Sequence, residues 1–117
     1  MQYLCLIYED ENYMMSRSEE EQQEIMSGYW AFTNDVKEHG QHVAGEALMP
    51  TETATTVRIR DGNRVTTDGP FAETKEQLGG FYLLECKDLD EAIELASQIP
   101  SAKYGSIEVR PVMVFDQ

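Results

Sequence analysis

Two segments of this sequence carry apolar side chains at consecutive positions, and this pattern limits the folds open to the chain. Residues 2–8 would place Tyr3, Cys5 and Ile7 on one face of a strand and Leu4, Leu6 and Tyr8 on the other. Gly80–Lys87 repeats the pattern, with Phe81 and Leu83 opposite Tyr82 and Leu84. Strands that are apolar on both faces are covered on both faces. Both segments are therefore predicted to be inner strands of a sheet that is covered on each side.

Two helices can be located from their end signals. Ser18 and Glu21 have the spacing of a capping box, and the predicted helix runs from about Ser18 to His39, ending at Gly40. Asp88 and Glu91 open a second helix, which Pro100 stops. The acidic run at residues 9–11 is interpreted as a solvated loop.

The remaining strands complete an α+β pattern. Predicted strands cover His42–Leu48, Thr53–Ile59, Arg64–Thr67 and Ile107–Phe115. The turn Asp61–Gly62–Asn63 joins the second and third of these as a hairpin. Pro111 cannot donate a hydrogen bond to a ladder, so the last strand should lie at an edge or carry a bulge. The order of elements is that of a ferredoxin-like split βαβ sheet with an inserted β-hairpin.

This pattern predicts a homodimer of single-domain chains. Residues 1–117 suffice for one core, and two helices can cover only one face of the sheet. The second apolar face needs a partner, and another copy of the chain is the simplest one. Pairing of the two sheets would give a dimeric α+β barrel.

Charge and hydropathy exclude several classes of protein. The chain has 22 acidic and 9 basic residues, a net charge of −13, which repels phosphate backbones and anionic membranes. It has no run of 18 apolar residues, and its first strand lacks the basic flank of a signal peptide. We therefore expect a cytoplasmic protein that contacts neither nucleic acid nor membrane, with Cys5 and Cys86 reduced and buried.

The segment Asp68–Gly69–Pro70–Phe71 is the most unusual stretch of the sequence. One interpretation is a turn, in which Asp68 bonds to nearby backbone, Gly69 is left-handed and Pro70 fixes the exit. The other is that the turn holds Asp68, Glu73 and Lys75 at the mouth of a cleft as acid, base or ligand clamp. The two interpretations are compatible.

At this point the sequence resembles a known family. Thr67–Gly80, together with residues 3–8, 44–48 and 108–112, resembles the DGPF-domain branch of the YCII-related family over nearly the whole chain. The resemblance implies a dimeric α+β barrel in small bacterial proteins of mostly undetermined activity. The YCII branch is thought to use a His–Asp pair for acid–base chemistry, but the corresponding positions here hold Tyr29 and Ile99. That mechanism therefore does not transfer directly.

Two functions stay open. In the first, the protein binds or transforms a small molecule without a cofactor, with Asp68 as the polar centre and Tyr8, Tyr29 and Phe71 as walls. Tyr29 could donate a proton or simply pack in the core, and Arg110 could clamp a ligand carboxylate or pair with an acid. In the second, it is a non-catalytic regulatory or interaction module, because proteins of this kind often accompany extracytoplasmic-function sigma factors.

His39 and His42 flank Gly40, but no third ligand stands at metal-binding spacing. Neither a phosphate loop nor a zinc motif is present, so we expect no cofactor.

Overall fold

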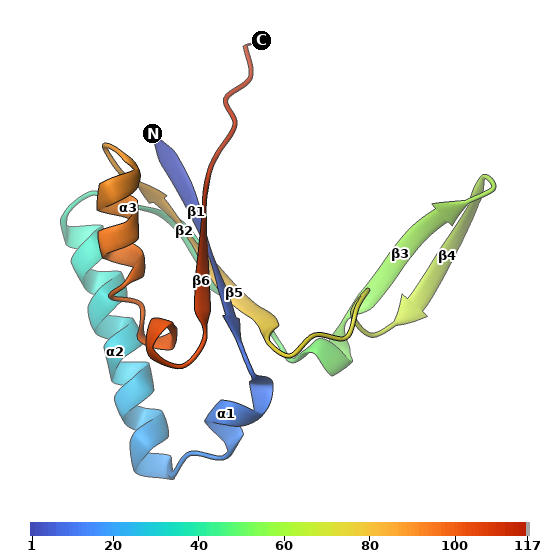
Figure 1. Ribbon diagram of the computed structural model, residues 1–117, viewed down its shortest axis with the longest axis horizontal. Coiled ribbons are helices and arrows are strands. Elements are labelled where there is room, and N and C mark those ends of the chain that lie inside the picture. Colours follow the sequence, from blue (N-terminus) through green and yellow to red (C-terminus); the bar gives the residue numbers. More distant parts are fainter. Residues whose placement is uncertain (117) are drawn as a thin grey trace.

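The computed structural model describes residues 1–116 and contains a four-stranded antiparallel sheet (Figure 1). Its strands follow the order β2–β5–β1–β6, with bounds His42–Ala47, Gln77–Glu85, Gln2–Glu9 and Ser106–Pro111. This is the ferredoxin-like order, in which the first and third strands of the split βαβ pattern are central. The α+β prediction and the inner positions of the two apolar strands are confirmed.

Both long helices lie on one face of this sheet (Figure 1). Helix α2, Glu19–Glu38, begins at the predicted capping box and ends before Gly40, whose φ of +69° is left-handed. Helix α3, Leu89–Ala96, begins at Asp88, whose carboxylate accepts the Glu91 N–H. Between these helices and the sheet lies the core, whose largest fully buried side chains include Leu84, Ile99, Val36, Cys5 and Cys86. Both cysteines are free, as predicted.

The other face of the sheet carries the second set of apolar side chains. Strand register places Leu4 beside Leu83 and Arg110, and Leu6 beside Phe81 and Glu108. The apolar members of this open face are only partly buried within the single chain, whereas their neighbours toward the helices are buried. The expected two-faced sheet is therefore present, and the chain's own helices cover one face of it.

The predicted hairpin forms a separate two-stranded sheet that projects from the rest of the molecule (Figure 1). Strands β3, Thr55–Arg60, and β4, Asn63–Asp68, are joined at Asp61 and Gly62, whose φ values of 51° and 77° fit a tight hairpin turn. Because of this projection the radius of gyration is 16.4 Å. A compact domain of this length would measure about 13 Å.

Three local expectations need correction. Strand β6 ends at Pro111 rather than Phe115, because it is an edge strand paired with β1, and β1 begins at Gln2. The Val112 N–H still donates to the Gln2 carbonyl at 2.9 Å, so Pro111 itself does not stop the pairing. Strand β3 begins at Thr55, since residues Thr51–Thr53 form the short 3₁₀ helix η1. The acidic run at 9–11 is not a loop: Glu9 ends β1, and Asp10 caps the short helix α1, Glu11–Met15.

Candidate functional site

A buried serine on the helix-covered side gathers three polar side chains around it. Ser101 lies in the 3₁₀ helix η2, Pro100–Lys103, and its side chain has no solvent exposure. Its Oγ donates to Glu9 Oε2 at 2.9 Å and lies 3.3 Å from Tyr104 Oη. It also makes a short hydrogen bond with Tyr29 Oη. These residues, Glu9, Tyr29, Ser101 and Tyr104, are called the hydroxyl cluster below.

The fold brings these residues together from distant parts of the chain. Glu9 is the last residue of β1, on the same face as Cys5 and Ile7, and Tyr29 lies on the sheet-facing side of α2. Gly28 allows α2 to approach η2 closely, since a Cβ at this position would stand 3.1 Å from Pro100 Cγ. The helix contact therefore positions Tyr29 against Ser101.

The hydrogen atoms of the cluster can be assigned by counting donors. Ser101 has one hydroxyl proton, and the geometry directs it to the Glu9 carboxylate. Tyr29 must then be the donor in its bond to Ser101. Burial raises the pKa values of both Tyr29 and Tyr104, so their hydroxyls stay protonated at neutral pH. The result is a directed chain of donors that ends on Glu9.

Two open cavities flank an aromatic stack at the edge of this cluster. The rings of Tyr13, from α1, and Tyr104 are stacked with centroids 3.9 Å apart and planes 14° from parallel. A cavity of about 410 Å³ lies on the side of α2 and η2, and another of about 510 Å³ lies on the side of Lys75 and Glu76. Both tyrosines line both cavities. Tyr104 therefore connects the hydroxyl cluster to space that a small molecule could enter.

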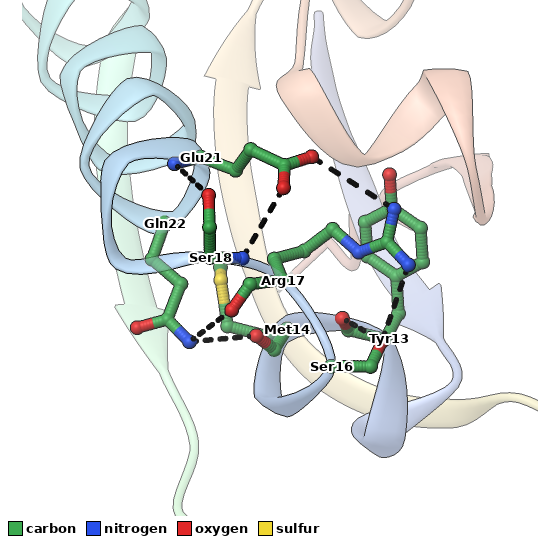
Figure 2. A network of polar contacts seen from close by, with 7 residues as sticks. All are labelled: Tyr13, Met14, Ser16, Arg17, Ser18, Glu21 and Gln22. Atoms are coloured by element: carbon green, nitrogen blue, oxygen red, sulfur yellow. Dashed lines mark hydrogen bonds and ion pairs between the residues drawn. The ribbon is translucent and has the colours of Figure 1, made fainter.

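Polar contacts hold α1, and with it Tyr13, in this position. The Glu11 carboxylate accepts from the N–H and hydroxyl of Thr51 at 2.7 and 2.9 Å, and the Glu11 N–H donates to Gln77. On the other side Gln22 Nε2 donates to the carbonyls of Met14 and Arg17 (Figure 2). Helix α1 thus links the sheet to α2 beside the cavities.

The predicted site residues lie in three separate places. Tyr29 belongs to the hydroxyl cluster. Tyr8 and Arg110 lie on strands β1 and β6, on the side of the open face. Asp68, Phe71, Glu73 and Lys75 are exposed in the segment that leaves the hairpin, where Lys75 lines the larger cavity. Within one chain, the structure does not bring Asp68 to Tyr29.

The segment at Asp68 has the geometry of a turn. Asp68 ends β4, and Gly69 follows with a φ of +99°, as the turn interpretation expects. The Gly69 N–H donates to the Ala54 carbonyl at 2.7 Å, and its carbonyl accepts from Thr56 Oγ1 at 2.8 Å. These two hydrogen bonds of Gly69 therefore join the two strands at the base of the hairpin.

The remaining candidates have local partners. The Arg110 guanidinium forms an ion pair with Glu108, which raises its pKa, in line with the acid-pairing interpretation. His39 Nδ1 lies 2.8 Å from the carbonyl of Asp35 and 3.5 Å from its carboxylate, and these contacts raise the pKa of the imidazole. Within residues 1–116 no three His, Cys, Asp or Glu side chains are arranged to hold a metal ion.

Sequence reasoning missed three of the four cluster residues and the stacked Tyr13. One signal was available: Ser101 follows Pro100 directly and lies two positions after Ile99, where the resemblance expected the acidic partner. Glu9 and Tyr104 carried no comparable signal, because a carboxylate after a strand and a tyrosine in a turn are ordinary surface features.

Comparison with known proteins shows the family of this chain and a solved structure with a similar fold. The sequence profile of the YCII-related domain matches residues 1–116. An uncharacterized protein of Rhizobium meliloti is 41% identical over 117 residues, covering 98% of this chain and 94% of that protein. Among solved structures, a 5-chloro-2-hydroxyhydroquinone dehydrochlorinase from Burkholderia phenoliruptrix, in complex with 2,5-dihydroxybenzoquinone, superposes with a TM-score of 0.57 at 15% identity. The superposition covers 97% of this chain and 94% of that one.

Among the helices of residues 1–116, none combines the length and apolar character that crossing a bilayer requires.

Proposed function

The chain belongs to the YCII-related domain family, and on this premise we propose that it is an acid–base protein that binds a small molecule beside Tyr104 and accepts a proton from it. The observation that carries the proposal is the buried Ser101, which joins two tyrosine hydroxyls to one carboxylate. A buried polar network of this kind supports a functional role, because an apolar residue at position 101 would fill the same space without requiring hydrogen-bond partners.

The proposed chemistry is a proton relay. A ligand in either cavity would pass a proton to Tyr104 Oη, the Tyr104 proton would move to Ser101 Oγ, and the Ser101 proton would move to Glu9. The ligand becomes an anion and Glu9 becomes neutral, so charge and protons balance. Tyr29 holds Ser101 in place by donating to its Oγ. As proposed, this step runs through side chains of the chain alone.

Dimerisation is part of the proposal. Two copies would pair through their open faces, covering the partly buried Leu4, Leu6, Phe81 and Leu83 and forming the dimeric α+β barrel. The Asp68–Phe71 motif supports assignment to the DGPF branch of the family. In this assembly we propose that Asp68, Phe71 and Glu73 line a cleft that the second copy closes, with Tyr8 and Arg110 on its sheet side. We further propose a bacterial cytoplasmic location.

Proton exchange tests the relay directly. Small carbonyl compounds and phenols would be incubated with the protein in D₂O, and loss of C–H signals would be followed by ¹H NMR. We expect at least one compound to exchange faster with the wild type than with Glu9→Gln or Ser101→Ala. Asp68→Asn separates the relay from the hairpin cleft: Asp68 lines neither cavity beside Tyr104, so this variant should exchange protons as fast as the wild type. Exchange that is equally fast in Glu9→Gln and wild type would refute the relay.

The projecting hairpin favours a second candidate, the non-catalytic interaction module. Val57, Ile59 and Val65 of the hairpin are 59%, 61% and 43% exposed, which is unusual for β-branched residues in strands. In this candidate the hairpin would contact a protein partner, with a sigma factor of the extracytoplasmic-function class as the proposed kind. Pull-down from the native cell with wild type and Ile59→Lys tests it. Recovery of the same proteins by both variants would contradict it.

A further inference from the structure

The cavity between α1, α2 and η2 is lined by as many bases as acids, although the chain as a whole is strongly acidic. The whole chain has only 9 lysines and arginines against 22 acids. Two of these bases, Arg17 and Lys103, line this one cavity of about 410 Å³. Such a cavity, in a protein whose surface otherwise repels anions, provides a local place where an anion can be held.

The Arg17 guanidinium is held in position but its hydrogen bonds are weak. It lies over the Tyr13 ring, with its central carbon 4.6 Å from the ring centroid. Nη2 donates to Ser16 Oγ at a long 3.4 Å, and Nη1 is 3.9 Å from the Glu21 carboxylate (Figure 2). Its Nε is buried and has no hydrogen-bond partner within residues 1–116. Aromatic stacking thus orients a cation whose donors are largely unused.

Glu21 does not form a close ion pair with Arg17, because its carboxylate is hydrogen-bonded to the start of α2. Its carboxylate accepts the Ser18 N–H at 3.2 Å, which closes the capping box at the start of α2 (Figure 2). This bond, with the smaller effect of Arg17, lowers the pKa of Glu21. A ligand carboxylate could therefore take the close position on the guanidinium that Glu21 leaves open.

The walls of the cavity indicate the rest of the ligand. Tyr13 already covers one face of the Tyr104 ring, so a ligand in the cavity meets the edge or the other face of that ring. An aromatic ligand makes favourable edge-to-face or offset contacts with such a surface. Glu21 and Glu24 line the same cavity, so its charged lining sums to zero, with two bases and two acids. A single negative charge suits this lining, whereas a phosphate or a dicarboxylate would meet the two glutamates.

We infer that this cavity binds a planar aromatic monocarboxylate, with its carboxylate on Arg17 and Lys103 and its ring against Tyr104. The inference rests on the proposed relay, because Tyr104 is also the cluster residue that would meet the ligand. It assigns the class of substrate that the proposal leaves open. A hydroxyl or acidic C–H on the ring would then lie near Tyr104 Oη, where the relay begins.

Titration with benzoate tests the inference, with benzamide as its uncharged counterpart. Binding would be followed by ¹H–¹⁵N NMR shifts at Tyr13, Gly28 and Tyr104. We expect benzoate to shift these resonances and benzamide to bind at least about tenfold more weakly, the loss typical of one charge-assisted hydrogen bond. Arg17→Gln should weaken benzoate binding by about tenfold or more, and Arg17→Lys by less, since it keeps the charge but loses the fork.

Arg60→Gln is the matched control, because Arg60 is an exposed arginine in the hairpin whose Nη1 donates to the Ile59 carbonyl. It should leave benzoate binding unchanged. Equal binding by Arg17→Gln and Arg60→Gln, equal binding of benzoate and benzamide, or no shift at these residues would each overturn the inference. Glu9→Gln separates the two ideas: it should abolish proton exchange and keep benzoate binding. If the protein exchanges protons with another compound but does not bind benzoate, the proposed ligand class is refuted and the proposed relay is not.

Discussion

Replacement of Ser101 by alanine should destabilise the protein far more than the loss of one hydroxyl normally does. The substitution removes the bond to the Glu9 carboxylate and leaves the Tyr29 hydroxyl without its acceptor. A hydrogen bond to a charged group contributes about 1.5–3 kcal/mol, and a buried unsatisfied donor costs about 1–3 kcal/mol. Glu9 is only partly buried and can regain water, so we take the lower part of each range. The expected loss is about 3 kcal/mol of unfolding free energy.

Tyr29→Phe should cost much less, about 1 kcal/mol, because Ser101 keeps Glu9 and Tyr104 as partners. In the double variant, which combines Ser101→Ala with Tyr29→Phe, residue 29 has no hydroxyl that could be left without an acceptor. Its unfolding free energy should therefore be no lower than that of Ser101→Ala alone, which gives a coupling of about 1 kcal/mol or more between the two positions. Two residues that act independently would show no coupling energy.

Urea unfolding followed by far-UV circular dichroism would measure these differences. Protein concentration must be the same throughout, since dimerisation would contribute to the apparent stability. Ser97→Ala is the control, because Ser97 is exposed and its hydroxyl bonds only to the Glu94 carbonyl. It should stay within about 0.5 kcal/mol of the wild type. The reasoning fails if Ser101→Ala costs less than about 1 kcal/mol, or if the two substitutions are additive.

Three further results are expected. Light scattering should give the wild type twice the chain mass of 13.3 kDa. Leu6→Glu should give the mass of a single chain, because it puts a charge on the open face. A monomeric wild type would rule out the dimer. By NMR, His39 should titrate above its usual pKa of 6.5 because of the Asp35 carbonyl and carboxylate, and Asp35→Asn, which removes the carboxylate alone, should lower this pKa only in part. Any contribution of this contact to stability should be complete below about pH 6.5 and disappear as pH rises through the raised pKa, whereas an unchanged titration in Asp35→Asn would contradict the assigned cause. Gly105→Ala should lower the unfolding free energy by several kcal/mol, about 3 or more, because its Cβ would stand 2.2 Å from a backbone carbonyl of β1. Gly79→Ala, whose Cβ would make an ordinary 3.5 Å contact, should cost much less, and equal losses would show that β1 can move aside.

The sequence was sufficient for features that depend on neighbours along the chain. The capping box at Ser18, the left-handed Gly40 and the tight turn at Asp61–Gly62 were all predicted, because each is set by a few consecutive residues. Apolar side chains on both faces of β1 and β5 predicted their central places, since side-chain direction in a strand follows directly from sequence position. Pro111 predicted either an edge position or a bulge for the last strand, and β6 lies at an edge.

The hydroxyl cluster was beyond the sequence because its members are far apart in the chain. Glu9 and Ser101 are separated by 92 positions, and Tyr29 and Ser101 by 72. Only the packing of α2 on η2, permitted at Gly28, decides that a helix tyrosine that packs against the core also brings its hydroxyl to that serine. The same holds for the Tyr13–Tyr104 stack, which needs the short helix α1 to turn back toward η2. Local patterns thus determined the elements and their faces, and tertiary packing alone decided which polar side chains share a site.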